Sequence, residues 1–312
     1  MRFVLFILTV CLMTLGATAY AQDDAIPLGS GDHIRTLIVD GLKRHYLVHI
    51  PAKYDPKQAT PVVIAFHGGG ANADHMVKFS GLDKKSDTAG FIVVYPYGTG
   101  RLSKILTFNG MNCCGYAMRN KIDDVEFTRK ILDDLAKLVN IKPKRVFATG
   151  MSNGAIMAHR LGSELSDRIA AIAPVAGTMG TESIVSKRAV SVIHFHGTAD
   201  ESLPFKGGRG KGLSDTDFYS VEHSVHAWVK ANGCKEDPLV EKFPDTAKDG
   251  TTIIRKTYGG CKDGAEVVLV EIEGGGHTWP GQKPPIKALG KSTDNISAND
   301  LMWDFFLKHP ME

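Results

Sequence analysis

The chain has 312 residues, enough to bury a substantial core, and its 37 Lys and Arg nearly balance its 34 Asp and Glu. No basic block is dense enough to indicate a nucleic-acid surface, so nucleic acid is excluded as a partner. The composition instead favours a small molecule or a polymer of another kind as the substrate.

The first 21 residues have the features of a signal peptide: a positive charge at Arg2, an apolar run over residues 3–15 and small residues that end at Ala21. Removal of this leader would leave one domain at 22–312 with a net charge near +2. No segment reaches the roughly 20 apolar residues of a membrane span. We therefore expect a secreted, monomeric protein, either extracellular or periplasmic. A lipoprotein would use Cys11, which lies inside the apolar run instead of at its polar end.

The first elements after the leader are predicted to be strands. Residues 34–50 alternate apolar and polar side chains around Asp40-Gly41, the pattern of a β-hairpin with a tight turn. An unbroken apolar run at 61–66 predicts a strand buried on both faces, and it ends in the glycine-rich loop 67–70. A similar strand follows at 91–95.

Helices and strands alternate from this point on. Apolar residues recur at spacings of three and four from Ile122 to Val139, which predicts an amphipathic helix that ends before Pro143. The elements expected next are a strand at 145–149, a helix at 153–165, strands at 169–173 and 190–195, a helix at 221–230, a strand at 266–272 and a helix at 301–307. This order predicts the α/β class, with a mostly parallel central sheet covered by helices on both faces. The unpatterned stretches 206–212 and 281–295 are long enough to be binding loops or lids.

Four cysteines remain after the leader is removed. An even number in an exported protein favours disulfides, and four cysteines allow three pairings. Cys234 and Cys261 lie at the two ends of a predicted strand pair, so we expect a disulfide between them. The neighbours Cys113 and Cys114 would then form a ring with each other or stay reduced, and the sequence leaves both possibilities open.

The pattern Gly150-Met151-Ser152-Asn153-Gly154 lies where a short strand meets a helix, which is the setting of a nucleophile elbow. Small residues on both sides allow a sharp turn that holds the serine hydroxyl at the carboxyl edge of the sheet. The amino end of the next helix then points at the site. A serine needs an imidazole to take its proton, and the imidazole needs a carboxylate to orient it. The sequence therefore predicts Ser152 as a nucleophile whose partners follow in the order acid, then histidine.

Two later residues fit the roles of acid and base. Asp200 follows the strand at 190–195 on a loop that leaves the carboxyl edge of the sheet, although a capping or turn aspartate is the alternative. His277 follows the strand at 266–272 and three consecutive glycines, and we expect it to be the general base. This chemistry needs no cofactor.

Ester hydrolysis also needs hydrogen-bond donors for the oxyanion, usually two backbone N–H groups. We expect one from Asn153, next to the nucleophile, and the other from the glycine-rich loop, with Gly69 favoured over Gly68. A plain strand-ending turn is the alternative for this loop. Trp279 lies beside the expected base, and it would either wall the substrate pocket or pack in the core.

Two other motifs indicate different chemistry. His194 and His196 lie on one side of a strand, a spacing that metal-dependent hydrolases use, with Asp200 as a further ligand. No third histidine follows at ligand spacing, so we expect no metal. The run 207–212 lacks the spacing and the Lys-Ser/Thr ending of a phosphate loop and is expected to be a surface loop. A binding protein that keeps the fold without turnover is a further alternative.

With these residues in place, the chain resembles the bacterial polyhydroxybutyrate depolymerase and feruloyl esterase family from about residue 36 to the end. The motifs that carry the resemblance are His67-Gly68-Gly69, Phe108-Asn109-Gly110, Cys113-Cys114-Gly115, Asp123-Asp124-Val125, Gly150 to Gly154, His196 to Asp200 and Gly276 to Gly281. The resemblance implies an α/β-hydrolase fold with Ser152, Asp200 and His277 as the triad, the three residues already reached from the motifs. Phe108 departs from the tryptophan of many members.

The resemblance leaves the substrate open, because members of this family act on hydroxyalkanoate polyesters, on feruloyl or acetyl groups of plant polysaccharides and on simple synthetic esters. No separate substrate-binding domain or Ser/Thr-rich linker is visible, whereas a degrader of solid polyester often carries one. We therefore expect a serine ester hydrolase for feruloyl- or acetyl-type polysaccharide esters or hydroxyalkanoate oligomers. A polyhydroxybutyrate depolymerase proper is the alternative.

Overall fold

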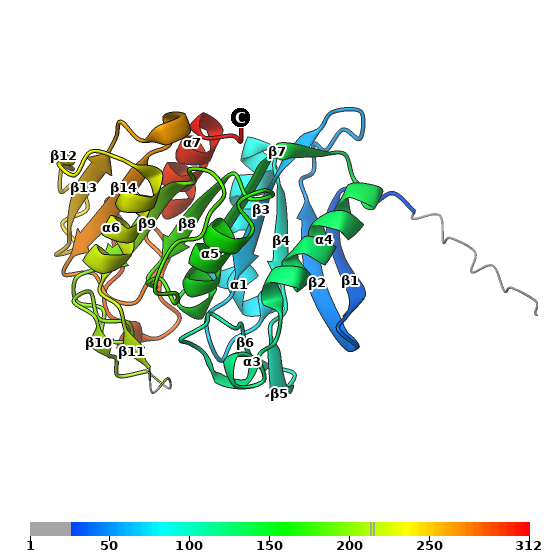
Figure 1. Ribbon diagram of the computed structural model, residues 1–312, viewed down its shortest axis with the longest axis horizontal. Helices are drawn as coiled ribbons and strands as arrows, with labels where there is room; N and C mark the ends of the chain where they lie inside the picture. The colour runs from blue at the N-terminus through cyan, green and yellow to red at the C-terminus, as the bar shows by residue number, and fades with distance from the viewer. Residues whose placement is uncertain (1–25, 213, 215) are drawn as a thin grey trace, which may run out of the picture.

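The computed structural model describes residues 26–212, 214 and 216–312, so the predicted signal peptide at 1–21 lies outside the described part of the chain. A ten-stranded sheet runs through the centre of the molecule (Figure 1). Its strands, in spatial order, are β1 (Gly31–Val39), β2 (Leu42–Ile50), β4 (Ile92–Pro96), β3 (Thr60–Phe66), β7 (Ile141–Met151), β8 (Ala171–Val175), β9 (Ser191–Gly197), β14 (Val267–Glu273), β13 (Thr252–Tyr258) and β12 (Leu239–Lys242). The strands from β4 to β14 are parallel, which confirms the predicted sheet.

Antiparallel strands form both edges of this sheet. The predicted hairpin at 34–50 is confirmed as β1 and β2, which pair from Gly31 opposite Ile50 to Val39 opposite Leu42. Its turn places Asp40 and Gly41 at φ 48° and 74°, backbone angles that Asp and Gly tolerate better than most residues. At the other edge, β12 and β13 pair antiparallel to each other, and β13 pairs antiparallel to β14.

Helices cover both faces of the sheet. One face carries α4 (Asp124–Leu138), α5 (Asn153–Glu164) and α6 (Val221–Asn232), which lie in front of the sheet in Figure 1. The other face carries α1 (Ala73–Ser80), α2 (Leu82–Ala89) and α7 (Ala298–Lys308). The two-sided cover explains why the parallel strands are unbroken apolar runs.

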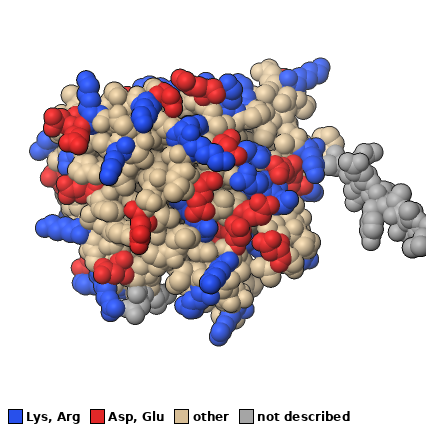
Figure 2. All heavy atoms as spheres, in the orientation of Figure 1, with Lys and Arg blue, Asp and Glu red and all other residues tan. Residues whose placement is uncertain are grey.

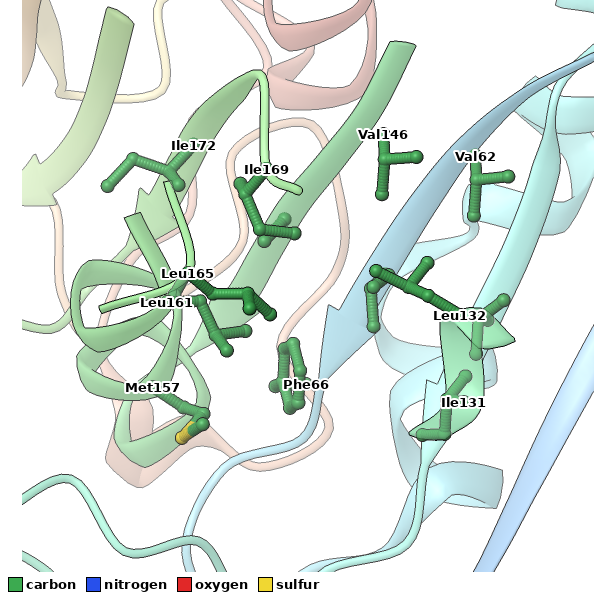
Figure 3. Packing of buried hydrophobic residues seen from close by; sticks show 14 of the residues in the cluster. Val62, Phe66, Ile131, Leu132, Val146, Met157, Leu161, Leu165, Ile169 and Ile172 are labelled. Atoms are coloured by element: carbon green, nitrogen blue, oxygen red, sulfur yellow. The ribbon is translucent and has the colours of Figure 1, made fainter. Parts of the chain in front are cut away.

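Alternate residues of each buried strand belong to separate cores. In β3, Val62, Ile64 and Phe66 pack under α4 and α5, whereas Val63 and Ala65 face the opposite helices. Figure 3 shows part of the first core, in which side chains from α4 and α5 meet those of the strands. Full burial of an aliphatic or aromatic side chain stabilises the fold by about 1.5–3 kcal/mol.

Several elements differ from the sequence-based expectation. The helices α1 and α2 were not predicted. In α2 only Leu82 and Ser86 are buried, so its sequence has little apolar periodicity. The strand expected at 145–149 begins at Ile141, and its pairing with β3 shifts register between Thr60 and Val62. The stretch 206–212 contains the short strand β10 (Gly208–Arg209), which pairs with β11 (Asp217–Phe218), and 281–295 contains the 3-10 turn η2 (Lys287–Leu289). A second 3-10 turn, η1, spans Lys262–Gly264.

A small substructure lies at the carboxyl edge of the parallel strands, at the bottom of Figure 1. The hairpin of β5 (Thr99–Leu102) and β6 (Ile105–Thr107) packs against α3 (Gly115–Arg119). The N–H of Ala117 in α3 donates to Thr107 Oγ1 in β6, at 3.1 Å. This substructure therefore forms a wall beside the edge where the motif residues are expected. Within the described residues, no helix has both the length and the apolar character of a membrane span.

Candidate active site

The predicted nucleophile lies in a tight turn between β7 and α5. Ser152 has φ 59° and ψ −119°, a strained conformation for a residue with a side chain, and its N–H donates to Val175 O at 3.0 Å. Only glycine fits on either side of the turn, since a Cβ on Gly154 would collide with the carbonyl of Phe66 and one on Gly150 with the backbone of Gly154. The turn exposes part of the Ser152 side chain at the amino end of α5.

The predicted acid and base are in contact. His277 Nδ1 lies 2.7 Å from Asp200 Oδ2, and the other carboxylate oxygen accepts from the N–H groups of Ser202 and Leu203 at 2.8 and 2.9 Å. Burial of the Asp200 carboxylate opposes its ionisation, but hydrogen bonds from His196 and His277 outweigh this effect and hold its pKa below the usual range. An ionised Asp200 fixes the proton of His277 on Nδ1 and leaves Nε2 as an acceptor.

Ser152 and His277 line the same cavity. No hydrogen bond joins these two described side chains, and a bond of this kind often tightens only when substrate is bound. The cavity is therefore lined by a serine and by an imidazole that is paired with a buried carboxylate.

The two histidines of the alternative metal hypothesis lie behind Asp200. His196 Nε2 is 2.9 Å from Leu203 O and 3.4 Å from Asp200 Oδ2, and its Nδ1 is 3.1 Å from His194 Nε2. Because a carbonyl only accepts, His196 carries its proton on Nε2 and accepts at Nδ1 from His194. His196 therefore supports the loop of Asp200 through Nε2, while its Nδ1 is occupied by His194.

The predicted oxyanion donors face each other across the turn. A Cβ on Gly69 would lie 3.5 Å from Asn153 Cβ, and one on Gly68 would lie 3.5 Å from Ser152 Cβ. His67 fixes this loop, since its Nδ1 donates to Gly68 O at 2.8 Å and its Nε2 accepts from the backbone N–H of Gly98 at 3.0 Å. The Gly68 carbonyl, which accepts this bond, and the Gly69 N–H belong to the same planar peptide group. The bond from His67 therefore also orients the Gly69 N–H.

His67 is neutral in this position. Burial lowers its pKa to about 4, and its two hydrogen bonds require one protonated and one unprotonated ring nitrogen. The sequence motif located this histidine, but its bond to the loop was not predicted.

The Asn153 side chain has a role that sequence reasoning missed. Its Oδ1 accepts from the N–H of Phe108 at 2.7 Å, and its Nδ2 donates to the carbonyl of the same residue at 2.9 Å. This two-point contact attaches the segment after β6 to the start of α5. Because the motif places no constraint on the partner of this side chain, only the fold identifies Phe108.

The cavity at the site has a volume of about 760 Å³. Its walls come from the turn at Ser152, the glycine-rich loop, the β5–β6 hairpin, α3 and the loops after β9 and β14. Its apolar members are Leu102, Ile105, Ile156, Leu203, Phe218, Ile286 and Leu289. A cavity of this size accommodates a small ester or the end of a larger one.

Trp279, which was considered for the pocket wall, lies in the core instead. Its side chain is fully buried, its ring packs edge-on to Phe79 and its Nε1 donates to Asn299 Oδ1 at 2.9 Å. It is absent from the described lining of the cavity. Its position two residues after His277 does not bring its ring to the cavity, because the side chain packs into the core.

Both cysteine pairs are disulfides in the structure. Cys234 and Cys261 join the end of α6 to the segment after β13, as expected from their spacing. Cys113 and Cys114 are bonded to each other, and both line the cavity beside α3. The second pair was left open by the sequence.

Comparison with known proteins is consistent with this geometry. No family model matches the chain. The chain is 30% identical over 290 residues to "Putative esterase NocK" of Nocardia uniformis subsp. tsuyamanensis, covering 88% of this chain and 82% of that protein. It is 26% identical to feruloyl esterase D of Neurospora crassa, with 96% of each chain covered. It is 29% identical to feruloyl esterase B of Piromyces equi over 75% of this chain, but it spans only 42% of that protein's length.

Solved structures of low sequence identity share the fold. Thermogutta terrifontis esterase 2 phosphorylated by paraoxon has a TM-score of 0.55 at 17% identity, covering 89% of this chain and 94% of that one. The acetyl xylan esterase from Aspergillus awamori has a TM-score of 0.54 at 14% identity, covering 88% and 99%. The expected α/β-hydrolase fold is confirmed.

The relatives define the chain as a carboxylic ester hydrolase, and the solved structures show its fold. The chain belongs to the esterase family of the Nocardia relative. The alternative of a binding protein without turnover is therefore set aside.

Proposed function

We propose that Ser152 is the nucleophile of this esterase, His277 its general base and Asp200 the acid that orients the base. The observation that carries the proposal is the 2.7 Å contact between His277 Nδ1 and Asp200 Oδ2, together with the position of Ser152 and His277 on one cavity. Three independent sequence motifs converge at this point.

The proposed reaction proceeds through an acyl-enzyme. Ser152 Oγ attacks the ester carbonyl carbon while His277 Nε2 takes its proton, and the N–H groups of Asn153 and Gly69 bind the oxyanion. Collapse of the tetrahedral intermediate breaks the bond to the alcohol, which leaves with the proton from His277. Water then attacks the acyl group by the same steps and releases the carboxylic acid and the free serine.

The proposed substrates are feruloyl- or acetyl-type polysaccharide esters, or hydroxyalkanoate oligomers. The feruloyl esterase names of two relatives support the first group. The apolar side chains of the cavity suit an aromatic or aliphatic acyl group equally. A polyhydroxybutyrate depolymerase proper remains the second candidate of the same chemistry.

We also propose that residues 22–312 form one exported esterase domain. N-terminal sequencing of the secreted protein tests this proposal, and the expected first residue is Gln22. The two disulfides support an oxidising compartment.

The experiment that tests the function compares p-nitrophenyl acetate, p-nitrophenyl butyrate and methyl ferulate as substrates for the wild type and Ser152→Ala. Turnover that disappears in the variant, with an unchanged thermal unfolding curve, supports the nucleophile. Preference for methyl ferulate over the alkyl esters supports the feruloyl substrates. Equal turnover by wild type and variant contradicts the proposal.

A further inference from the structure

Two arginines line the cavity that holds Ser152 and His277. They are Arg101 at the exposed end of β5 and Arg119 at the end of α3, two elements that pack against each other. Among the described residues that line this cavity, none is an Asp or a Glu. The wall formed by β5 and α3 therefore carries positive charge and no compensating negative charge.

The charge imbalance extends along the two chain segments that supply this wall and the loop of the base. Residues 98–122 and 274–293 contain seven of the 37 Lys and Arg and none of the 34 Asp and Glu. These seven residues are Arg101, Lys104, Arg119, Lys121, Lys283, Lys287 and Lys291. In Figure 2, Lys and Arg side chains lie at the lower edge of the molecule, where Figure 1 places β5, β6 and α3. Outside these segments acidic residues outnumber basic ones, so the imbalance is local.

The third segment of the cavity wall differs from these two. Residues 202–214 contain three basic side chains and, like the other two segments, no acidic ones, but one of the three is paired with an acidic neighbour. Lys211 pairs with Glu201 at 2.8 Å. The positive character is therefore a property of the walls at Arg101 and His277.

Arg101 and Arg119 form no ion pair within the described residues, whereas six other arginines do. Other arginines contact carboxylates at 2.7–3.2 Å, namely Arg35 with Asp134, Arg44 with Asp124, Arg160 with Glu164 and Arg168 with Asp133. A guanidinium group without a protein partner at the mouth of a cavity suits a carboxylate of the ligand, which it can bind through two parallel hydrogen bonds.

We propose that this esterase selects short aliphatic oligoesters that end in a free carboxylate, and that Arg101 and Arg119 bind that carboxylate. The apolar side chains that line the cavity together with Ser152 and the arginines suit an aliphatic chain, and the guanidinium groups suit its charged end. The same field raises the rate at which anionic esters reach the cavity. This inference rests on the proposed function and specifies its substrate.

The first test uses two esters of similar length that differ in charge. 4-(Butanoyloxy)butanoate carries a carboxylate at the end of the alcohol chain, the part of the ester in which a hydroxyacid oligoester carries it, and butyl butanoate carries a methyl group there. The wild type should prefer the butanoyloxybutanoate in kcat/KM, measured by acid release at constant pH, and Arg101→Gln and Arg119→Gln should each reduce that preference about tenfold. Hydrolysis of butyl butanoate should stay within about twofold of the wild type. Added salt should weaken the preference in the wild type and have less effect in the double variant.

Arg145→Gln is the matched control, since it removes the same charge near the amino end of β7, at the opposite edge of the sheet. This variant should keep the wild-type preference. Equal losses for both esters in the Arg101 and Arg119 variants, or no preference in the wild type, would overturn the inference.

The second test identifies the source of the carboxylate. Trimers of 3-hydroxybutyrate with a free carboxylate end should be hydrolysed faster than trimers that end in a carboxamide, and the double variant should remove the difference. If acetylated oligogalacturonate is instead the substrate that depends on both arginines, the oligoester assignment is overturned. If only this inference fails, hydrolysis of butyl butanoate still depends on Ser152. If the proposed function fails, Ser152→Ala still hydrolyses butyl butanoate.

Discussion

Replacement of Asn153 by alanine removes the contact that attaches the Phe108 segment to the start of α5. The Phe108 N–H would lose its partner, and the Phe108 carbonyl would keep only the long bond from the Cys114 N–H at 3.4 Å; Asn153 is only 1% exposed, so water cannot easily replace the lost contacts. A buried polar group without a partner costs about 1–3 kcal/mol. We therefore expect Asn153→Ala to lower the free energy of unfolding by roughly 1–4 kcal/mol.

The assay is urea unfolding followed by tryptophan fluorescence, with the slope against urea unchanged. In addition, kcat/KM for p-nitrophenyl butyrate should fall about 10- to 100-fold, because a displaced Asn153 N–H weakens the oxyanion site. Neutral substitutions on a protein surface change stability by up to about 0.5 kcal/mol. A loss of stability smaller than this for Asn153→Ala would refute the reasoning.

Asn232 provides a matched control for this experiment. Its side chain makes the same two-point contact to one backbone residue, Val190, with distances of 3.1 and 2.7 Å, and it is also fully buried. Val190 precedes β9 at the edge of the sheet opposite Ser152. Asn232→Ala should therefore lose similar stability while kcat/KM stays near the wild-type value.

Asn153→Asp keeps the shape of the side chain and replaces its amide with a carboxylate. The new carboxylate would keep the contact to the Phe108 N–H but would turn a second oxygen toward the Phe108 carbonyl, so its folded-state pKa would rise. A raised carboxylate pKa means that the folded state binds the proton more tightly than the unfolded state. The loss of stability relative to the wild type should then shrink as the pH falls from about 7 towards about 4.

Three further predictions follow from single sites. Asp200→Asn should lower kcat by about 10⁴ in steady-state assays, because the amide no longer fixes the His277 tautomer. Gly154→Ala should lower stability by more than about 2 kcal/mol in thermal unfolding, because its Cβ would meet the Phe66 carbonyl, whereas Gly259→Ala, with open space around it, should be neutral. The folded-state pKa of His67 is about 4, below its unfolded value, so wild-type stability should fall from about pH 6.5 to about pH 4, and His67→Gln should reduce that slope.

The parallel strands and the larger helices were predictable because their signals are local. The apolar run at 61–66 reflects a strand that is buried on both faces. The spacing of apolar residues from Ile122 to Val139 reflects a helix that is buried on one face. The helix α2 was not predictable, since its position depends on packing against β2, β4 and α7 and not on its own pattern. Local patterns thus defined the elements that bury many side chains and missed those that bury few.

In the candidate site, too, local sequence patterns were informative and contacts between distant segments were not. Ser152, Asp200 and His277 could be proposed as a triad because each follows a strand end, and parallel strands bring their carboxyl ends to one edge. Contacts between loops were not predictable, as the bond from Asn153 to Phe108 and the burial of Trp279 show. Their partners depend on how the segments after β6 and β14 fold back over the sheet.

The measurement that tests the central claim most directly is covalent labelling with an organophosphonate, followed by peptide mass spectrometry. The account predicts one adduct per chain on Ser152, a loss of p-nitrophenyl butyrate hydrolysis in proportion to labelling, and neither labelling nor turnover in Ser152→Ala. An adduct on another residue, or full hydrolysis by a fully labelled protein, would contradict it.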